Sequence, residues 1–265
     1  MIKIVGIPAL VGTYDNYIWI LFDEHAAKAW VVDPGESQQV IDFLQQRNLD
    51  LAAILVTHRH FDHIDGIAAL KQNFANCTVY GPELTPLNLI DKRLREGDQV
   101  TLSGDLSFQV LETPGHTEDH ISYYNDHLLF CADTLFTGGC GRILGGTAEQ
   151  FADSIIKLRN LNDDLLFYCA HEYTADNLAF AAYVDPGNPV LQQRLKETVI
   201  NYPALHDGKV GTLGLEKQTN PFMRFDMEPL KSQLLAKGST ETPAQLFATL
   251  RTWKDHVDQG VENIN

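Results

Sequence analysis

The sequence has few cysteines, little basic charge and no long apolar run, and each shortage argues against a class of protein. Its four cysteines are widely separated and form no Cys-x-x-Cys pair: Cys77, Cys131, Cys140 and Cys169. The sequence therefore predicts neither a disulfide framework nor a thiolate zinc site, and free thiols are expected. No apolar stretch approaches the roughly 20 residues that a membrane-spanning helix requires.

Charge and length narrow the possibilities further. The 265 residues include 20 basic and 35 acidic side chains, which give a formal net charge of −15. Such a charge opposes general attraction to nucleic acid or anionic lipid, so an anionic substrate needs a local basic patch. Residues 1–8 have neither the apolar core nor the cleavage site of a secretory signal, which favours a cytoplasmic protein. The length predicts one large domain or two modest ones.

What the chain does contain is a dense run of metal-binding residue types, Thr57-His58-Arg59-His60-Phe61-Asp62-His63. Histidine nitrogens and carboxylate oxygens suit zinc and its neighbours in the first-row series. A single histidine is more often an ordinary core or surface residue than a metal ligand. Three histidines and an aspartate so close together are difficult to explain by packing, so metal binding is the leading interpretation.

The residues on either side of this run predict where it lies in the fold. Residues 51–56 form a short continuous apolar stretch, which is typical of a buried strand, and apolar residues at helical spacing follow from Ile64. The candidate ligands are thus expected in a loop between the end of a strand and the start of a helix, where α/β proteins usually place their sites. Alternate residues of one loop can face two centres, so one segment can serve two ions.

Further candidate ligands lie near the ends of other predicted strands: His116, Asp133 and His171. Asp133 could instead cap a helix or form a turn. With the histidines present, a bridging carboxylate is the preferred interpretation. Four other histidines have no cluster of candidate ligands near them in the sequence and are expected on the surface: His25, His127, His206 and His256.

Predicted strands and helices alternate along the first two thirds of the chain. Strands are expected at residues 17–22, 29–32, 51–56, 107–111, 121–124, 128–131 and 165–169. Helices are expected at 38–46, behind the possible cap Ser37, and at 149–161, 175–183, 190–202 and 243–257. A stretch rich in glycine and proline separates the last two helices. Two groups of strands with helices between them favour an α/β protein with layered sheets.

These motifs resemble those of the metallo-β-lactamase superfamily. The resemblance is carried by residues 57–63, Gly115-His116-Thr117, Ala132-Asp133 and His171. It implies a four-layer αββα sandwich over residues 1–172, with metal ions between the sheet edges. A smaller helical substrate-binding domain would follow over residues 173–265.

Within this superfamily the chain is similar to the glyoxalase II, or hydroxyacylglutathione hydrolase, family over nearly its whole length. The similarity is carried by Gly139-Cys140-Gly141-Arg142, His171-Glu172-Tyr173-Thr174, Asp185-Pro186-Gly187-Asn188-Pro189 and Arg251-Thr252-Trp253-Lys254-Asp255. Three positions depart from the family pattern, and at one of them, Leu144, some relatives carry an aromatic residue. Asp65 and Asp119 stand where glycine is common and add carboxylates near the ligands.

The resemblance implies a role for each candidate residue. One metal ion would be held by His58, His60 and His116, the other by Asp62, His63 and His171, with Asp133 bridging them. The glutathione part of a substrate would contact Arg142, Tyr173, Arg251 and Lys254. Composition alone favours a solvated helix face for Arg251 and Lys254. Asp33 would steady a metal ligand from behind, or simply form a turn.

The activity implied by the resemblance is hydrolysis of S-D-lactoylglutathione and related 2-hydroxyacyl glutathione thioesters, the second step of methylglyoxal detoxification. A metal-bridging hydroxide, oriented by Asp133, would attack the thioester carbonyl. Two divalent ions are expected, zinc first, with iron or manganese also suited to the ligands. The alternatives are a lactonase, a β-lactam hydrolase, a glutathione persulfide dioxygenase, or a metal-stabilised binding module without catalysis. A monomer acting on a small molecule, without nucleic-acid or membrane partners, is expected.

Overall fold

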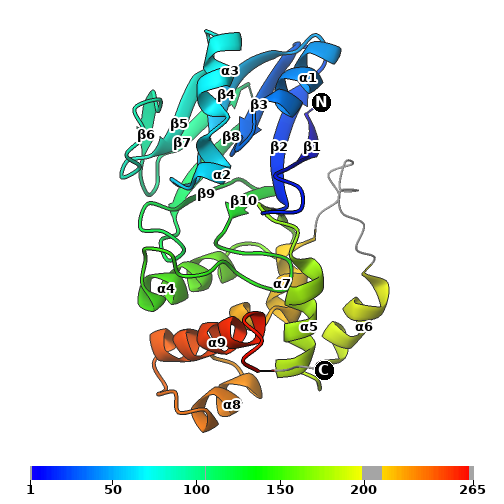
Figure 1. Cartoon of the computed structure of the whole chain (residues 1–265), viewed down its shortest axis with the longest axis vertical. Coiled ribbons are helices and arrows are strands. Elements are labelled where there is room, and N and C mark those ends of the chain that lie inside the picture. The colour runs from blue at the N-terminus through cyan, green and yellow to red at the C-terminus, as the bar shows by residue number, and fades with distance from the viewer. Residues whose placement is uncertain (1, 105, 199–210, 263–265) are drawn as a thin grey trace.

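Two β-sheets lie face to face in the computed structural model of the chain, and helices cover their outer faces (Figure 1). The structure describes residues 2–104, 106–198 and 211–262. Within these residues the first sheet consists, in spatial order, of β1 (Lys3–Ala9), β2 (Asn16–Asp23), β3 (Lys28–Val32), β4 (Asp50–Leu55), β5 (Thr78–Pro82) and β6 (Lys92–Leu94). The second consists of β11 (Leu166–Cys169), β10 (Leu128–Ala132), β9 (Ile121–Tyr124), β8 (Leu106–Glu112) and β7 (Gln99–Ser103). The predicted four-layer αββα architecture is confirmed.

Strand β2 illustrates how one sheet serves two cores. Ile18 and Ile20 pack in a cluster with α1 (Gln38–Gln46) and α3 (Ile67–Asn73), on the outer face of the first sheet. Trp19 belongs instead to the core between the sheets. Successive side chains of a strand point to opposite faces. Because both faces of β2 are covered, nearly all of the strand is buried.

Large aromatic side chains fill the space between the two sheets. Trp19 of β2 meets Tyr168 of β11 edge to face, with ring centroids 4.9 Å apart. Tyr168 also stacks on Phe130 of β10 at 4.8 Å. Burial of such side chains stabilises the sandwich. It also fixes the two sheets relative to each other, so loops from both sheets can build one site.

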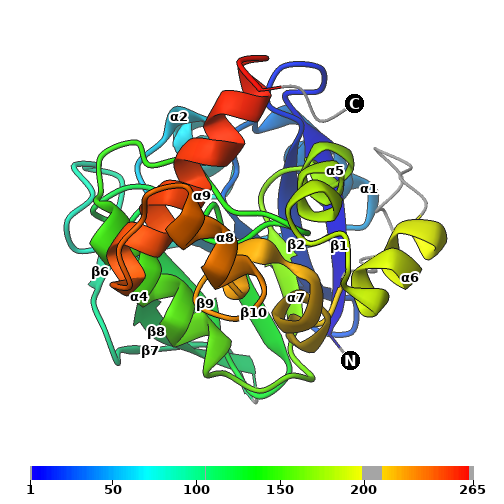
Figure 2. The same cartoon turned by 90° about the horizontal axis from the view of Figure 1, so that it is seen from below.

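Apart from the one-turn helix α2 (Phe61–Ile64), the remaining α-helices gather on the outer side of the second sheet. They are α4 (Ala148–Arg159), α5 (Thr174–Val184), α6 (Pro189–Glu197), α7 (Leu213–Thr219), α8 (Leu230–Ala236) and α9 (Pro243–Asp258). Helices α4 and α9 lie side by side in both views (Figures 1 and 2), and the rings of Phe151 and Phe247 are 4.9 Å apart. Their shared core includes side chains of β10 and β11. None of the helices in the described residues is long and apolar enough to cross a membrane.

The predicted strands and helices agree with the observed ones to within a few residues, with some differences. Helix α6 ends at Glu197, and residues 199–202 of the predicted helix lie outside the described residues. Ser37 stands at the N-cap of α1, but its side chain makes no capping hydrogen bond. The glycine- and proline-rich stretch contains α7 and α8, which the sequence analysis did not predict. All four cysteines are buried and free, as expected.

Candidate metal centre and substrate cavity

The metal-binding run begins where β4 ends. Thr57 and His58 are buried directly beyond the strand, which pairs in parallel with β3 and β5. His60 then stands at the N-cap of α2 (Phe61–Ile64). Asp62 and His63 therefore lie in a one-turn helix, and the prediction that all four ligands occupy a loop is wrong for these two. The ring of His63 still lies close to that of His58, with ring centroids 4.1 Å apart.

Four side chains form what we call the first cluster: His58, His60, His116 and Asp133. Nδ1 of His60 lies 3.1 Å from Nε2 of His58 and 2.9 Å from Nε2 of His116. Oδ2 of Asp133 lies 3.2 Å from Nε2 of His116. Ligands that are about 2.0–2.1 Å from a tetrahedral zinc ion are about 3.3–3.4 Å from one another. The first cluster thus has nearly the dimensions of a metal site.

Hydrogen bonds around the first cluster leave two facing nitrogens as acceptors. Nδ1 of His116 donates to the carbonyl oxygen of Arg142 at 2.7 Å, so Nε2 of a neutral ring is bare. The hydroxyl of Thr57 donates its own proton to a carboxylate and therefore accepts from Nδ1 of His58 at 3.0 Å. Nε2 of His58 is then bare as well. A single proton on Nδ1 of His60 can be donated to Nε2 of His58 or to Nε2 of His116, but not to both. A cation can accept a lone pair from each of the three facing ring nitrogens, so the donor set fits a metal ion.

The second cluster consists of Asp62, His63 and His171. Oδ2 of Asp62 lies 3.4 Å from Nε2 of His63 and 3.6 Å from Nε2 of His171. Nδ1 of His171 donates to the carbonyl oxygen of Tyr14 at 2.7 Å. This bond orients the ring so that Nε2 faces the cluster.

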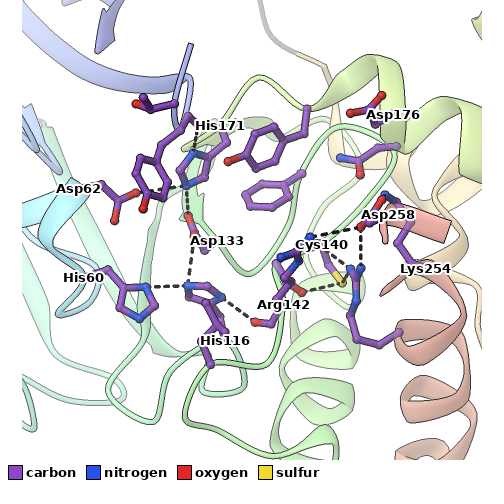
Figure 3. A pocket seen from close by; sticks show the side chains of 18 of the residues that line it. His60, Asp62, His116, Asp133, Cys140, Arg142, His171, Asp176, Lys254 and Asp258 are labelled. Carbon is purple, nitrogen blue, oxygen red and sulfur yellow. Dashed lines mark hydrogen bonds and ion pairs between the residues drawn. The ribbon is translucent and has the colours of Figure 1, made fainter. Parts of the chain in front are cut away.

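Asp133, a member of the first cluster, also faces the second cluster (Figure 3). Its Oδ1 is 3.4 Å from Nε2 of His63 and 3.3 Å from Nε2 of His171, while its Oδ2 faces His116. Among the described residues, Oδ1 of Asp133 and Nε2 of His63 are buried without a hydrogen-bond partner. Buried polar atoms are rarely left unpaired. One carboxylate oxygen toward each cluster is the geometry that a bridging ligand needs.

The pKa shifts differ between the two clusters. Burial lowers the pKa of each histidine in the first cluster, so these rings are neutral at pH 7 and can offer lone pairs. Burial is the largest influence on the histidines of the second cluster and disfavours their charge, but the charge of Asp133 and the hydrogen bonds of each ring together outweigh burial and raise both pKa values. The raised pKa values favour a proton on each of these rings beside the carboxylates. Metal binding replaces such protons.

Two buried residues hold the second cluster from behind. Oδ2 of Asp33 is 3.0 Å from Nδ1 of His63, and its Oδ1 accepts from the backbone nitrogen of Thr57 at 2.8 Å. Nδ2 of Asn16 donates to Oδ2 of Asp62 at 3.1 Å. Asp33 is one of the residues predicted here from the sequence, whereas Asn16 is not. No local pattern marks Asn16, because the aspartate that it contacts is 46 positions away.

The carboxylates that depart from the family pattern do not join either cluster. Asp65 is exposed at the surface. Asp119 is buried, and it accepts hydrogen bonds from Arg59 at 3.2 Å and from Thr85 at 2.5 Å. These contacts tie three loops together beside the first cluster. The two acidic residues therefore leave the candidate ligand sets unchanged.

The other histidines fall into two groups. His25, His127 and His256 are exposed, as expected, and His206 lies outside the described residues. His120, for which the sequence predicts no role, is buried and stacks on His58 with ring centroids 4.9 Å apart. His120 thus packs against a candidate ligand without joining either cluster.

A cavity of about 610 Å³ opens beside the clusters (Figure 3). Its walls include the four residues expected to bind substrate: Arg142, Tyr173, Arg251 and Lys254. Arg251 and Lys254 are each only 4% exposed, so the interpretation of a solvated helix face is wrong for both. The ring of Tyr173 stacks on His171 with an interplanar angle of 2°. A cationic wall and the two clusters thus share one cavity.

Comparison with known proteins places the chain in a family. Residues 14–171 match the model of the metallo-beta-lactamase superfamily, and residues 172–257 match the model described as hydroxyacylglutathione hydrolase C-terminus. A hydroxyacylglutathione hydrolase of Hydrogenovibrio crunogenus is 46% identical over 261 residues, which cover 97% of this chain and 96% of that protein. The chain belongs to the hydroxyacylglutathione hydrolase family. The family member of Pseudoalteromonas translucida is 43% identical, over 95% of this chain and 99% of that protein.

Solved structures share the fold of this chain at lower sequence identity. ETHE1 from Myxococcus xanthus superposes with a TM-score of 0.64 and 26% identity, covering 94% of this chain and 98% of that one. The BLEG-1 B3 metallo-beta-lactamase gives a TM-score of 0.60 at 24% identity. The match covers 84% of this chain and 99% of that one. The latter likeness concerns the fold alone. Both hydroxyacylglutathione hydrolases above are considerably more similar in sequence than either structure.

Proposed function

We propose that the chain hydrolyses S-D-lactoylglutathione and related 2-hydroxyacyl glutathione thioesters to the hydroxy acid and glutathione. For the lactoyl ester this is the second step of methylglyoxal detoxification. The proposal rests above all on Asp133, which directs one carboxylate oxygen to each cluster in a cavity with a cationic wall. The 46% identity to a protein named hydroxyacylglutathione hydrolase supports this choice of substrate.

The two clusters are proposed to hold two divalent metal ions. One ion is assigned to His58, His60 and His116, the other to Asp62, His63 and His171, and Asp133 is assigned to both. Zinc is the proposed metal, and iron or manganese suits the same nitrogen and oxygen donors. Divalent ions bound in such a site lower the pKa of a coordinated water toward about 7 and act as Lewis acids.

The chain's own residues orient the substrate and the attacking water. Each oxygen of Asp133 has two lone pairs, so the carboxylate can accept a hydrogen bond from water in addition to its proposed ligand role. Burial raises the pKa of Tyr173, whose phenol therefore keeps its proton and can donate to the substrate. Addition of water oxygen to the carbonyl carbon is followed by cleavage of the carbon–sulfur bond. The thiolate leaves readily without a strong general acid, because thiol pKa values are about 8.5.

The cationic wall is proposed to bind the glutathione part of the substrate. Glutathione carries two carboxylates, and an arginine can pair with one through two parallel hydrogen bonds while a lysine adds a point charge. Arg142, Arg251 and Lys254 supply these groups within one cavity. This local patch answers the difficulty that the net charge of −15 poses for an anionic substrate.

Several broader expectations belong to the same proposal. Residues 1–172 would form the catalytic domain and residues 173–265 a substrate-binding domain, since Tyr173, Arg251 and Lys254 come from the latter. The matches of separate family models to residues 14–171 and 172–257 support this division. A monomeric state and a cytoplasmic location are also proposed.

A substrate panel tests the function directly. We expect the metal-loaded chain to hydrolyse S-D-lactoylglutathione with a kcat/KM far above that for a simple lactone or a β-lactam, and without consuming oxygen. Release of free thiol and oxygen uptake would be followed in parallel on the same enzyme. A higher kcat/KM for the lactone or β-lactam, or oxygen uptake with glutathione persulfide, would reject the proposal.

A further inference from the structure

The cationic wall of the cavity already contains a carboxylate. Asp258, the last residue of α9, lines the cavity (Figure 3). Its Oδ1 pairs with Nζ of Lys254. Its Oδ2 lies 3.5 Å from Nη2 of Arg251 and 3.8 Å from Nη2 of Arg142. All three cations proposed to bind glutathione thus converge on Asp258.

The surroundings of Asp258 explain why it lies there. Arg251 and Lys254 are each 4% exposed, and buried cations without a nearby anion are costly. Asp255 forms an ion pair with Arg251 at 2.8 Å. Within the described residues, no ion pair joins Asp255 to Lys254. Asp258 therefore supplies the ion pair of Lys254.

The position of Asp258 also suits a carboxylate that can leave. The C-terminal end of a helix carries a partial negative charge and disfavours an anion. The side chain of Asp258 is 21% exposed, so it has access to water on one side. Among the described residues, ion pairs are the contacts that hold its side chain beside the three cations.

We propose that Asp258 is an internal competitor for the substrate carboxylate. It occupies the cations in the absence of a ligand, and a carboxylate of the glutathione part displaces it on binding. Asp258 thereby weakens the affinity of the site for glutathione derivatives and sets their KM. This inference rests on the proposed function, because it takes a glutathione thioester as the ligand.

Competition by Asp258 has a consequence for turnover. The glutathione product retains both carboxylates of the thioester, so the cationic wall alone would hold product about as strongly as substrate. Binding that is equal in ground and transition states lowers KM without raising kcat. A resident carboxylate that returns to the cations promotes release of the product.

Binding of S-methylglutathione tests the proposal without turnover, because this thioether has both carboxylates but no bond that the enzyme cleaves. Calorimetric titration would compare the metal-loaded parent chain with Asp258→Asn at low ionic strength. We expect the variant to bind about fivefold or more tightly, since a like charge beside the ligand carboxylate is removed. Asp258→Glu, which keeps the charge, should bind about as weakly as the parent.

Two controls separate this effect from a general change of charge. Asp126→Asn removes an exposed carboxylate in the turn before β10, whereas the clusters lie beyond the other end of that strand. Its affinity should stay within about twofold of the parent, because a charge beyond a Debye length is screened. The diethyl ester of S-methylglutathione lacks both carboxylates, so it should gain no affinity from Asp258→Asn.

The outcomes distinguish the inference from the proposed function. Tighter binding of S-methylglutathione by Asp258→Asn, absent with the diester, supports internal competition. Unchanged binding overturns it, and weaker binding overturns it by making Asp258 a ligand of the substrate ammonium. A parent chain that does not hydrolyse S-D-lactoylglutathione defeats the proposed function instead. Thermal unfolding of each variant verifies that it is folded.

Discussion

The carboxylate of Asp33 accepts a hydrogen bond from Nδ1 of His63 at 3.0 Å while also holding the backbone of Thr57 at 2.8 Å. One side chain thus fixes a candidate ligand of the second cluster and the start of the metal-binding loop. Asp33 has a φ of 51°, a left-handed conformation that asparagine also tolerates. Replacement by asparagine therefore removes the charge without adding backbone strain.

We predict that Asp33→Asn lowers metal affinity about 10- to 100-fold, as loss of a carboxylate behind a ligating histidine usually does. Competition with a chromophoric chelator would measure the affinity. Asp42→Asn is a control at an exposed position on α1. Equal metal affinity in Asp33→Asn and the parent would mean that Asp33 only forms the turn.

A second prediction concerns the cationic wall. Lys254→Met should raise KM for S-D-lactoylglutathione roughly tenfold, since hydrogen bonds to charged groups contribute about 1.5–3 kcal/mol. The value of kcat should change little, because the contact lies in the binding part of the substrate. Lys92→Met, at an exposed position on β6, is the matched control. A fall in kcat at constant KM would contradict the assignment.

A third prediction concerns pH and stability. Arg159 of α4 pairs with Asp226 through two hydrogen bonds, of 2.6 and 2.8 Å. Burial raises the pKa of Asp226, but its bonds with Arg159 outweigh burial, so the pKa lies below its usual value. The ionised form therefore stabilises the folded state above the unfolded pKa of about 3.9, and this contribution is lost as pH falls through the lowered pKa.

Asp226→Asn should lower the free energy of unfolding by about 1 kcal/mol at pH 7, because the pair is partly exposed. The difference from the parent should shrink as the pH falls below about 4. Urea unfolding over a series of pH values would measure it. Asp153→Asn, exposed on α4, should have little effect at any pH. A difference that grows on acidification would refute the proposed linkage.

Much of the fold could be predicted because both faces of the sheets are covered. Strands such as β2 and β4 are buried almost throughout, so their sequences read as continuous apolar runs. Strand β1 has a half-buried pattern at a sheet edge and contains Pro8, which weakens the signal. Helices α7 and α8 have only seven residues each, too few for a clear helical period.

The residues of the candidate site could be predicted only where several lie close together in the sequence, or where they match a motif of the family that the chain resembles. Residues 57–63 are such a run. Asn16 and Asp258 are single polar residues whose surroundings become evident only after distant segments come together. The short helix that carries Asp62 and His63 has one turn, which leaves no periodic trace.

The most direct test of the account combines elemental analysis with thioester hydrolysis for the parent chain and Asp133→Asn. We predict two divalent ions per parent chain and rapid hydrolysis of S-D-lactoylglutathione. The variant should remain folded but lose more than about a hundredfold in kcat/KM. Even the loss of a residue that only hydrogen-bonds to a metal ligand typically lowers metal affinity or activity about 10- to 100-fold. Full activity of Asp133→Asn, or an active parent that binds no metal, would be incompatible with hydrolysis at a two-metal site that Asp133 bridges.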